Sequence, residues 1–116
     1  MSNKSIIAVL FALPIVITQA SAHATLDHSD PRVGNTVKSS PSAVTLWFTQ
    51  KLEPAFSSAQ VTNASGAVVS SGASVSGTVM RVGVRSLPPG TYRVHWKVLS
   101  VDTHTTEGSF SFRVGQ

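Results

Sequence analysis

The side chains of this sequence that could do chemistry are few, and two of them lie close together. The chain of 116 residues has no cysteine, and it has four histidines and five carboxylates. This composition excludes disulfides, thiolate sites for zinc or copper, and a cysteine nucleophile. The closest grouping is Asp102-Thr103-His104. In an extended segment, residues two apart point the same way, so Asp102 and His104 can present an oxygen and an imidazole to one metal ion. In the alternative interpretation, Asp102 caps a turn through its side chain and His104 is merely exposed.

The start of the chain has the features of a secretory signal. Lys4 supplies a positive charge, residues 6–17 are uncharged and mostly apolar, and Ala20-Ser21-Ala22 is a small-residue cleavage motif. The apolar stretch is shorter than the roughly 20 residues that a membrane-spanning helix needs. We therefore predict a signal peptide over 1–22 and an exported, periplasmic domain over 23–116.

The predicted cleavage would create a metal ligand at the new amino terminus. Cleavage after Ala22 makes His23 the first residue, and a free amine beside an imidazole forms a bidentate chelate. The amine has an ordinary pKa of about 7.7–8.0, so a metal ion displaces its proton readily near neutral pH. Ala22-His23-Ala24 is a competing cleavage motif, and cleavage after Ala24 would remove His23. The prediction of a terminal ligand therefore depends on where the signal is cut.

Together, His23, Asp102 and His104 offer nitrogen ligands and one carboxylate oxygen. This set suits Cu(II) in a tetragonal geometry, and thiolate ligands that would hold Cu(I) are missing. Met80 is the only methionine after the predicted signal, and its place in a predicted strand favours a core position. We predict one Cu(II) ion per chain, bound by these three residues.

The elements that must position these ligands are β-strands. Segments rich in β-branched and aromatic residues predict strands over 44–49, 58–62, 78–84, 91–99 and 109–114, while 70–77 is either a loop or a weak edge strand. Turn signals with Pro, Gly, Asn or Ser separate them. In the segment 91–99, Tyr92, Val94, Trp96 and Val98 alternate with polar residues, so we expect the apolar face in the core. This pattern predicts an all-β fold: a single Greek-key β-sandwich.

The remaining candidates have simpler interpretations. Nine Lys and Arg stand against five Asp and Glu, without a run of basic residues, which argues against a nucleic-acid partner. We expect His28 to be a solvated or packed residue of a first strand, and His95 to be an exposed strand residue. We expect Trp47 and Trp96 to fill the core.

Several motifs resemble the CopC family of periplasmic copper-resistance proteins. The resemblance rests on His23-Ala24-x-Leu26, on Leu46-x-Phe48-Thr49, on Gly90-Thr91-Tyr92-x-Val94-x-Trp96 and above all on Ser100-x-Asp102-x-His104-x-x-x-Gly108. It implies a β-sandwich of cupredoxin-like or immunoglobulin-like topology and assigns the Cu(II) ligands of the family to His23, Asp102 and His104.

Two positions of this sequence differ from the pattern of the CopC family, and the family also implies a partner. Where the family has a Cu(I) site it uses a methionine-rich loop, and residues 57–77 contain no methionine, which implies a member with the Cu(II) site only. Many relatives carry an acid where this chain has Gln50; if that acid supports the site, its loss would change the pH dependence of binding. The family further implies an inner-membrane copper-transport partner of the CopD type.

The predicted function is that of an exported, non-enzymatic and monomeric protein that captures, buffers or delivers Cu(II) in copper homeostasis and resistance. One alternative is a copper monooxygenase, because an amino-terminal histidine bound through amine and ring resembles a histidine brace. Another is a structural sandwich that binds no metal.

Overall fold

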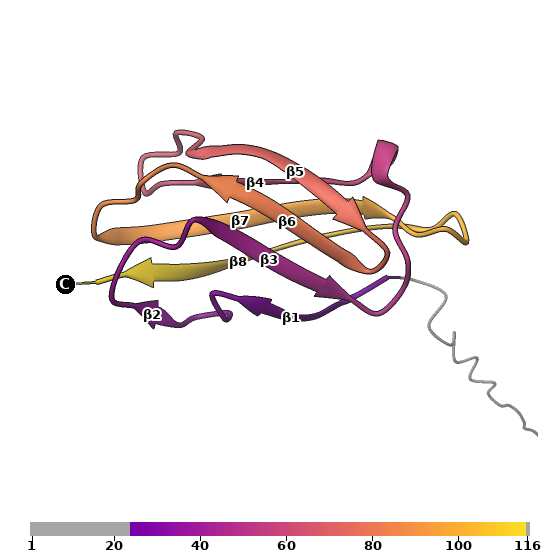
Figure 1. Ribbon diagram of the computed structural model, residues 1–116, viewed down its shortest axis with the longest axis horizontal. Coiled ribbons are helices and arrows are strands. Elements are labelled where there is room, and N and C mark those ends of the chain that lie inside the picture. Colours follow the sequence, from indigo (N-terminus) through magenta and orange to yellow (C-terminus); the bar gives the residue numbers. More distant parts are fainter. Residues whose placement is uncertain (1–23, 116) are drawn as a thin grey trace, which may run out of the picture.

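Two four-stranded β-sheets pack face to face in the computed structural model, which describes residues 24–115 (Figure 1). The first, here the β3 sheet, has the order β1-β3-β6-β5, with the bounds Leu26–Asp30, Ala43–Phe48, Val79–Val84 and Ser70–Ser76. The second, the β7 sheet, has the order β2-β8-β7-β4, with the bounds Thr36–Val37, Thr105–Val114, Gly90–Leu99 and Ser58–Thr62. All pairings are antiparallel except that of β2 with β8. The predicted all-β sandwich is therefore confirmed.

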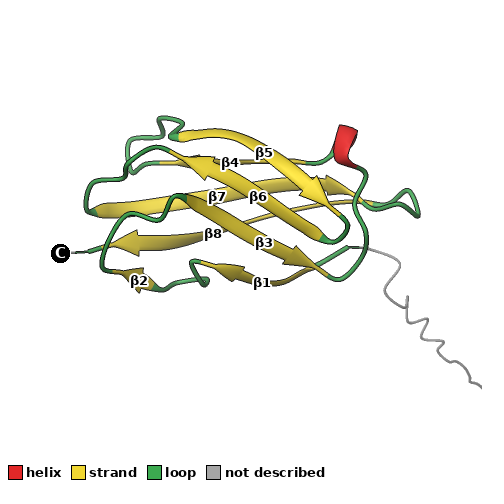
Figure 2. Cartoon of the chain, in the orientation of Figure 1, coloured by secondary structure: helices red, strands yellow, loops and turns green. Residues whose placement is uncertain are grey.

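Loops and one short 3₁₀ helix, η1 (Pro54–Phe56), connect the strands (Figure 2). Proline occupies the first turn of η1, where its missing N–H costs nothing. No helix among residues 24–115 is long and apolar enough to cross a membrane.

The strands predicted from the sequence agree with the structure to within one residue except over 109–114, and the sequence patterns do not predict the two-residue strand β2. The strand predicted over 109–114 begins four residues earlier, at Thr105, because β8 pairs with β7 along its whole length, from Leu99 opposite Thr105 to Gly90 opposite Val114. The residues Thr105–Gly108 lack large apolar side chains, so tertiary pairing rather than periodicity extends the strand. The segment Ser70–Ser76 forms an edge strand against β6, which is one of the two predicted alternatives.

The core lies between the sheets and follows the predicted alternation. Tyr92, Val94, Trp96 and Val98 of β7 are buried while the residues between them are exposed. Phe48 of the opposite sheet packs against Trp96 edge to face, with ring centroids 5.2 Å apart. Met80 is fully buried, which confirms its predicted core position.

Trp47 is not in the core, contrary to the prediction. It alternates with the buried residues Leu46 and Phe48 on β3, so its side chain lies on the outer face of the sheet and is half-buried. The imidazole of His28 stacks on it, with ring centroids 4.3 Å apart and an angle of 9° between the planes. The strand's period of two, rather than the size of the residue, decides its position.

Gly108 of β8 is required by the packing of Trp96. The two residues are cross-strand partners, and a Cβ added at Gly108 would lie 2.5 Å from Cζ2 of the Trp96 ring. Such a contact forces the buried ring or the strand to move.

We expect Gly108→Ala to lower the free energy of unfolding by about 1–3 kcal/mol, because it overpacks the core at Trp96. Denaturant unfolding of both proteins measures the difference. Ser111→Ala, at an exposed position of the same strand, is the control and should change stability by about 0.5 kcal/mol or less. Equal stabilities of the glycine variant and the parent would contradict the packing argument.

Candidate metal centre

Asp102 and His104 lie in the tight turn that joins β7 to β8. Within it, the N–H of Ser100 donates to the carbonyl of His104 at 2.9 Å, and the N–H of Thr103 donates to the carbonyl of Ser100 at 2.8 Å. Thr103 has a φ of 73°, a left-handed conformation that reverses the chain. The sequence interpretation assumed an extended segment, which is wrong; the turn itself brings the two side chains together.

The two side chains are close enough to share an ion. Nδ1 of His104 lies 3.5 Å from Oδ1 of Asp102, and the two side chains are 45% and 41% exposed. Metal–nitrogen and metal–oxygen bonds of about 2.0–2.2 Å can span this separation. The predicted pairing of an oxygen and an imidazole is therefore present, in a position that is open to solvent.

Ser100 is the residue whose position links these two ligands. It is fully buried, and its hydroxyl donates to Oδ1 of Asp102. The hydroxyl oxygen of Ser100 also accepts the backbone N–H of His104, at 3.4 Å. The hydrogen bond from Ser100 is the main reason that the pKa of Asp102 is below its ordinary value, and the nearby His104 lowers it further.

The predicted third ligand, His23, lies outside the described residues, but the residue after it is well placed. Ala24 is fully buried, and its carbonyl accepts a hydrogen bond from Oγ1 of Thr106 at 2.6 Å. Thr106 is two residues beyond His104 on β8. Thr25 is paired with Thr49 through both backbone and side chain, at 2.9–3.2 Å. The amino-terminal segment thus runs to the end of the sandwich that carries the turn (Figure 1).

The other two described histidines lie elsewhere and each contact a carboxylate. Nδ1 of His28, on β1, lies 2.7 Å from Asp27, and Nε2 of His95, on the exposed face of β7, lies 2.8 Å from Glu107. The exposed position predicted for His95 is confirmed, and His28 is both partly exposed and packed on Trp47. No cluster of three or more metal-binding side chains forms within residues 24–115.

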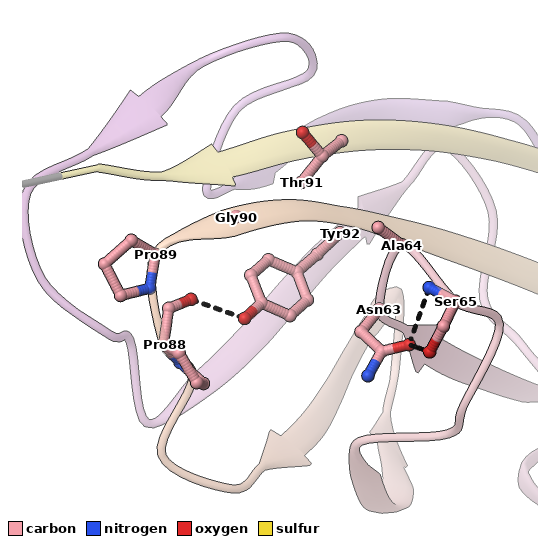
Figure 3. A pocket seen from close by; sticks show the side chains of 8 residues that line it. All are labelled: Asn63, Ala64, Ser65, Pro88, Pro89, Gly90, Thr91 and Tyr92. Atoms are coloured by element: carbon pink, nitrogen blue, oxygen red, sulfur yellow. Dashed lines mark hydrogen bonds between the residues drawn. The ribbon is translucent and has the colours of Figure 1, made fainter.

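A shallow hollow at the other end of β7 is a different feature. Figure 3 shows it between the loop at Asn63–Ser65 and the segment Pro88–Tyr92, where the hydroxyl of Tyr92 donates to the carbonyl of Pro88. None of its lining residues is a histidine or a carboxylate. The hollow therefore has no histidine or carboxylate side chain, whereas the turn between β7 and β8 has one of each.

Sequence comparison places the chain in a family. A model of the CopC domain matches residues 26–115, so the chain belongs to the CopC family. Copper resistance protein C of Xanthomonas campestris pv. juglandis is 35% identical over 116 residues, which cover 91% of each protein. Copper transport protein CutJ of Bacillus subtilis is 28% identical, and the match covers 98% of this chain but 22% of CutJ.

Solved structures agree with this assignment. CopC from Methylosinus trichosporium OB3b superimposes with a TM-score of 0.77 at 32% identity, over 80% of this chain and 94% of that one. PcoC from Escherichia coli, described as a methionine-rich copper resistance protein, superimposes with a TM-score of 0.72 at 32% identity, over 80% and 99%. The family predicted from the sequence motifs is therefore confirmed.

Replacement of Ser100 by alanine should raise the pKa of Asp102 toward its ordinary value, because the hydrogen bond that stabilises the carboxylate is lost. A pKa lowered in the folded state makes a stability contribution that is present above the ordinary pKa and is lost as the pH falls through the lowered one. NMR titration of the Asp102 carboxyl carbon in the metal-free protein measures this shift. Ser57→Ala removes a hydroxyl that contacts Leu99 rather than Asp102 and should leave the titration unchanged. An unchanged pKa in Ser100→Ala would contradict the assignment.

Proposed function

We propose that this protein is exported, loses residues 1–22 as a signal peptide, and binds one Cu(II) ion through His23, Asp102 and His104. Membership of a family whose relatives are named for copper resistance and copper transport supports a copper function. The observation that carries the proposal is the hydrogen bond from Thr106 to the carbonyl of Ala24. It anchors the residue after His23 to the strand that begins directly after His104.

The anchor limits how far the terminal ligand must reach. Consecutive Cα atoms are about 3.8 Å apart, so fixing Ala24 restricts its predecessor to a small region. Hydrogen bonds between Thr25 and Thr49 hold the residue after Ala24 as well, so the backbone of Ala24 is fixed on its carboxyl side. In the proposed centre, these contacts lower the entropic cost of bringing an amino-terminal chelate to Asp102 and His104, because Ala24 is already held in the folded protein.

The ligand chemistry favours Cu(II) over Cu(I). Imidazole, amine and carboxylate ligands suit the divalent ion, and soft thioether ligands select the monovalent one. PcoC is described as methionine-rich. In contrast, residues 57–77 of this chain have no methionine, and Met80 is fully buried in the core. The protein is therefore proposed as a carrier of Cu(II) alone.

Capture, buffering and delivery fit this centre better than catalysis does. In a histidine brace, open coordination positions are needed for oxygen chemistry, and a carboxylate from Asp102 would occupy one of them. The match to about a fifth of CutJ, a copper transport protein, supports a relation between this domain and membrane transport. We propose that the protein is a periplasmic monomer that exchanges copper with an inner-membrane transporter of the CopD type.

The protein with His23 as first residue, confirmed by intact mass, should bind one equivalent of Cu(II) with a dissociation constant in the nanomolar range or tighter, about 12 kcal/mol or more. A competition titration measures this. His23→Ala, or one residue added before His23, should weaken binding by orders of magnitude, because either change destroys the terminal chelate. His104→Ala and Asp102→Ala should also weaken it, the imidazole by more. Weak binding of several ions by the parent, or unchanged affinity in these variants, would contradict the proposal.

The anchor provides a separate test. Thr106→Val keeps the shape of the side chain but removes the bond to Ala24, so Cu(II) affinity should fall toward that of a free peptide with the sequence His-Ala-Thr. The same competition titration compares the protein with the peptide. Thr105→Val, at the exposed neighbouring position, is the matched control and should retain the affinity of the parent. Full affinity in Thr106→Val would show that the anchor is not needed.

A further inference from the structure

The hydroxyl of Ser100 is a buried polar group that contacts both candidate ligand residues. Ser100 is fully buried at the end of β7, where it forms an isolated bridge with Leu52 of the connection between β3 and β4. Its hydroxyl is within hydrogen-bond distance of the carboxylate of Asp102, the N–H of His104 and the carbonyl of His104. One hydrogen bond is enough to satisfy a buried hydroxyl, and this hydroxyl has three possible partners, of which two are acceptors that compete for its one proton.

The hydroxyl of Ser100 donates its single proton to the carboxylate of Asp102 rather than to the carbonyl of His104. The carbonyl of His104 already accepts the backbone N–H of Ser100 at 2.9 Å, and its contact with the hydroxyl is 3.2 Å. The contact with Oδ1 of Asp102 is the shorter of the two, and a charged acceptor forms the stronger hydrogen bond. The lone pairs of the hydroxyl remain for the N–H of His104.

This arrangement holds the carboxylate by one oxygen. Oδ1 of Asp102 carries the contact with Ser100 and the longer contact with Nδ1 of His104. Because Ser100 is fixed by its backbone on both sides, the carboxylate is held against a rigid strand end although its side chain is 41% exposed. An exposed carboxylate without such a contact would sample several rotamers and lose entropy on binding an ion.

We propose that Ser100 is a positioning residue of the metal centre, whose hydroxyl orients the carboxylate of Asp102 toward an ion shared with His104. The inference rests on the proposed function of this centre. Ser100 does not itself bind copper; it acts through Asp102, in the way that outer hydrogen-bond partners orient metal ligands in other proteins.

Ser57 offers a matched control. Its hydroxyl accepts the N–H of Leu99 at 3.1 Å and lies 3.4 Å from the carbonyl of the same residue, one position before Ser100. Ser57→Ala and Ser100→Ala therefore each remove a hydroxyl near the end of β7, the first half-buried and the second fully buried, and only the second removes a contact with Asp102. A structural effect of losing a hydroxyl that contacts this strand end should appear in both variants.

The test is a double-mutant cycle on Cu(II) affinity. Competition titrations compare the parent, Ser100→Ala, Asp102→Ala and the double variant, each with His23 as first residue. We expect Ser100→Ala to weaken binding about 10- to 100-fold and Ser57→Ala to have no such effect. In the Asp102→Ala background, Ser100→Ala should have little further effect, because the residue through which it acts is gone. Electron paramagnetic resonance of Ser100→Ala at saturating copper should shift toward the spectrum of Asp102→Ala, which a purely structural role would not produce.

Three outcomes would overturn the inference. One is that Ser100→Ala binds Cu(II) as the parent does. The second is that it weakens binding equally with and without Asp102, and the third is that it weakens binding no more than Ser57→Ala does; both would assign its effect to the fold. Thermal melts of the metal-free variants check that each is folded. If Asp102→Ala and His104→Ala leave the affinity unchanged, the proposed centre itself fails, and that result is distinct from a failure of Ser100 alone.

Discussion

The pairing of β7 with β8 is the constraint on which the rest of this structure depends. The two strands, of ten residues each, are in register from end to end, with Gly90 opposite Val114 and Leu99 opposite Thr105. This register places Gly108 beneath the ring of Trp96 and closes the chain into the turn that carries Asp102 and His104. A slip of one residue would turn every side chain of one strand to the opposite face and would place the core residues in solvent. The same pairing that builds the core therefore shapes the candidate metal centre.

The three ion pairs found within residues 24–115 all join a histidine to a carboxylate, and they differ in a way that matters for metal binding. At His28 and His95 the nitrogen and oxygen are 2.7 and 2.8 Å apart, which is hydrogen-bond distance. At His104 the separation is 3.5 Å, while the carboxylate of Asp102 accepts a hydrogen bond from Ser100. The shorter hydrogen bond of the Asp102 carboxylate is therefore with Ser100, and its separation from the histidine nitrogen is wider than in the other two pairs.

Most of the fold follows from local patterns in the sequence. Alternation in 91–99 predicts which face of β7 is buried, because successive side chains of a strand point to opposite faces and each sheet of the sandwich has one buried face. The motif around Asp102 and His104 also predicts that these two side chains lie close together, and Nδ1 of His104 is 3.5 Å from Oδ1 of Asp102. The patterns fail where a residue's neighbours in space decide its environment. Trp47 is half-buried outside the core because its side chain, next to the inward-facing Leu46 and Phe48, points to the outer face of β3. Thr105–Gly108 are in a strand because they pair with β7.

What the sequence by itself determined is the inventory: the absence of cysteine, the β-strand periodicity, the family and the pair Asp102 and His104. What only the tertiary structure decided is how these groups are arranged. The left-handed Thr103 and the buried hydroxyl of Ser100 define the turn, and Thr106 holds Ala24 across 82 positions of the chain. Contacts between residues so far apart depend on how the two sheets pack and on strand register. Local spacing carries no information about either, so these contacts appear only once the chain has folded.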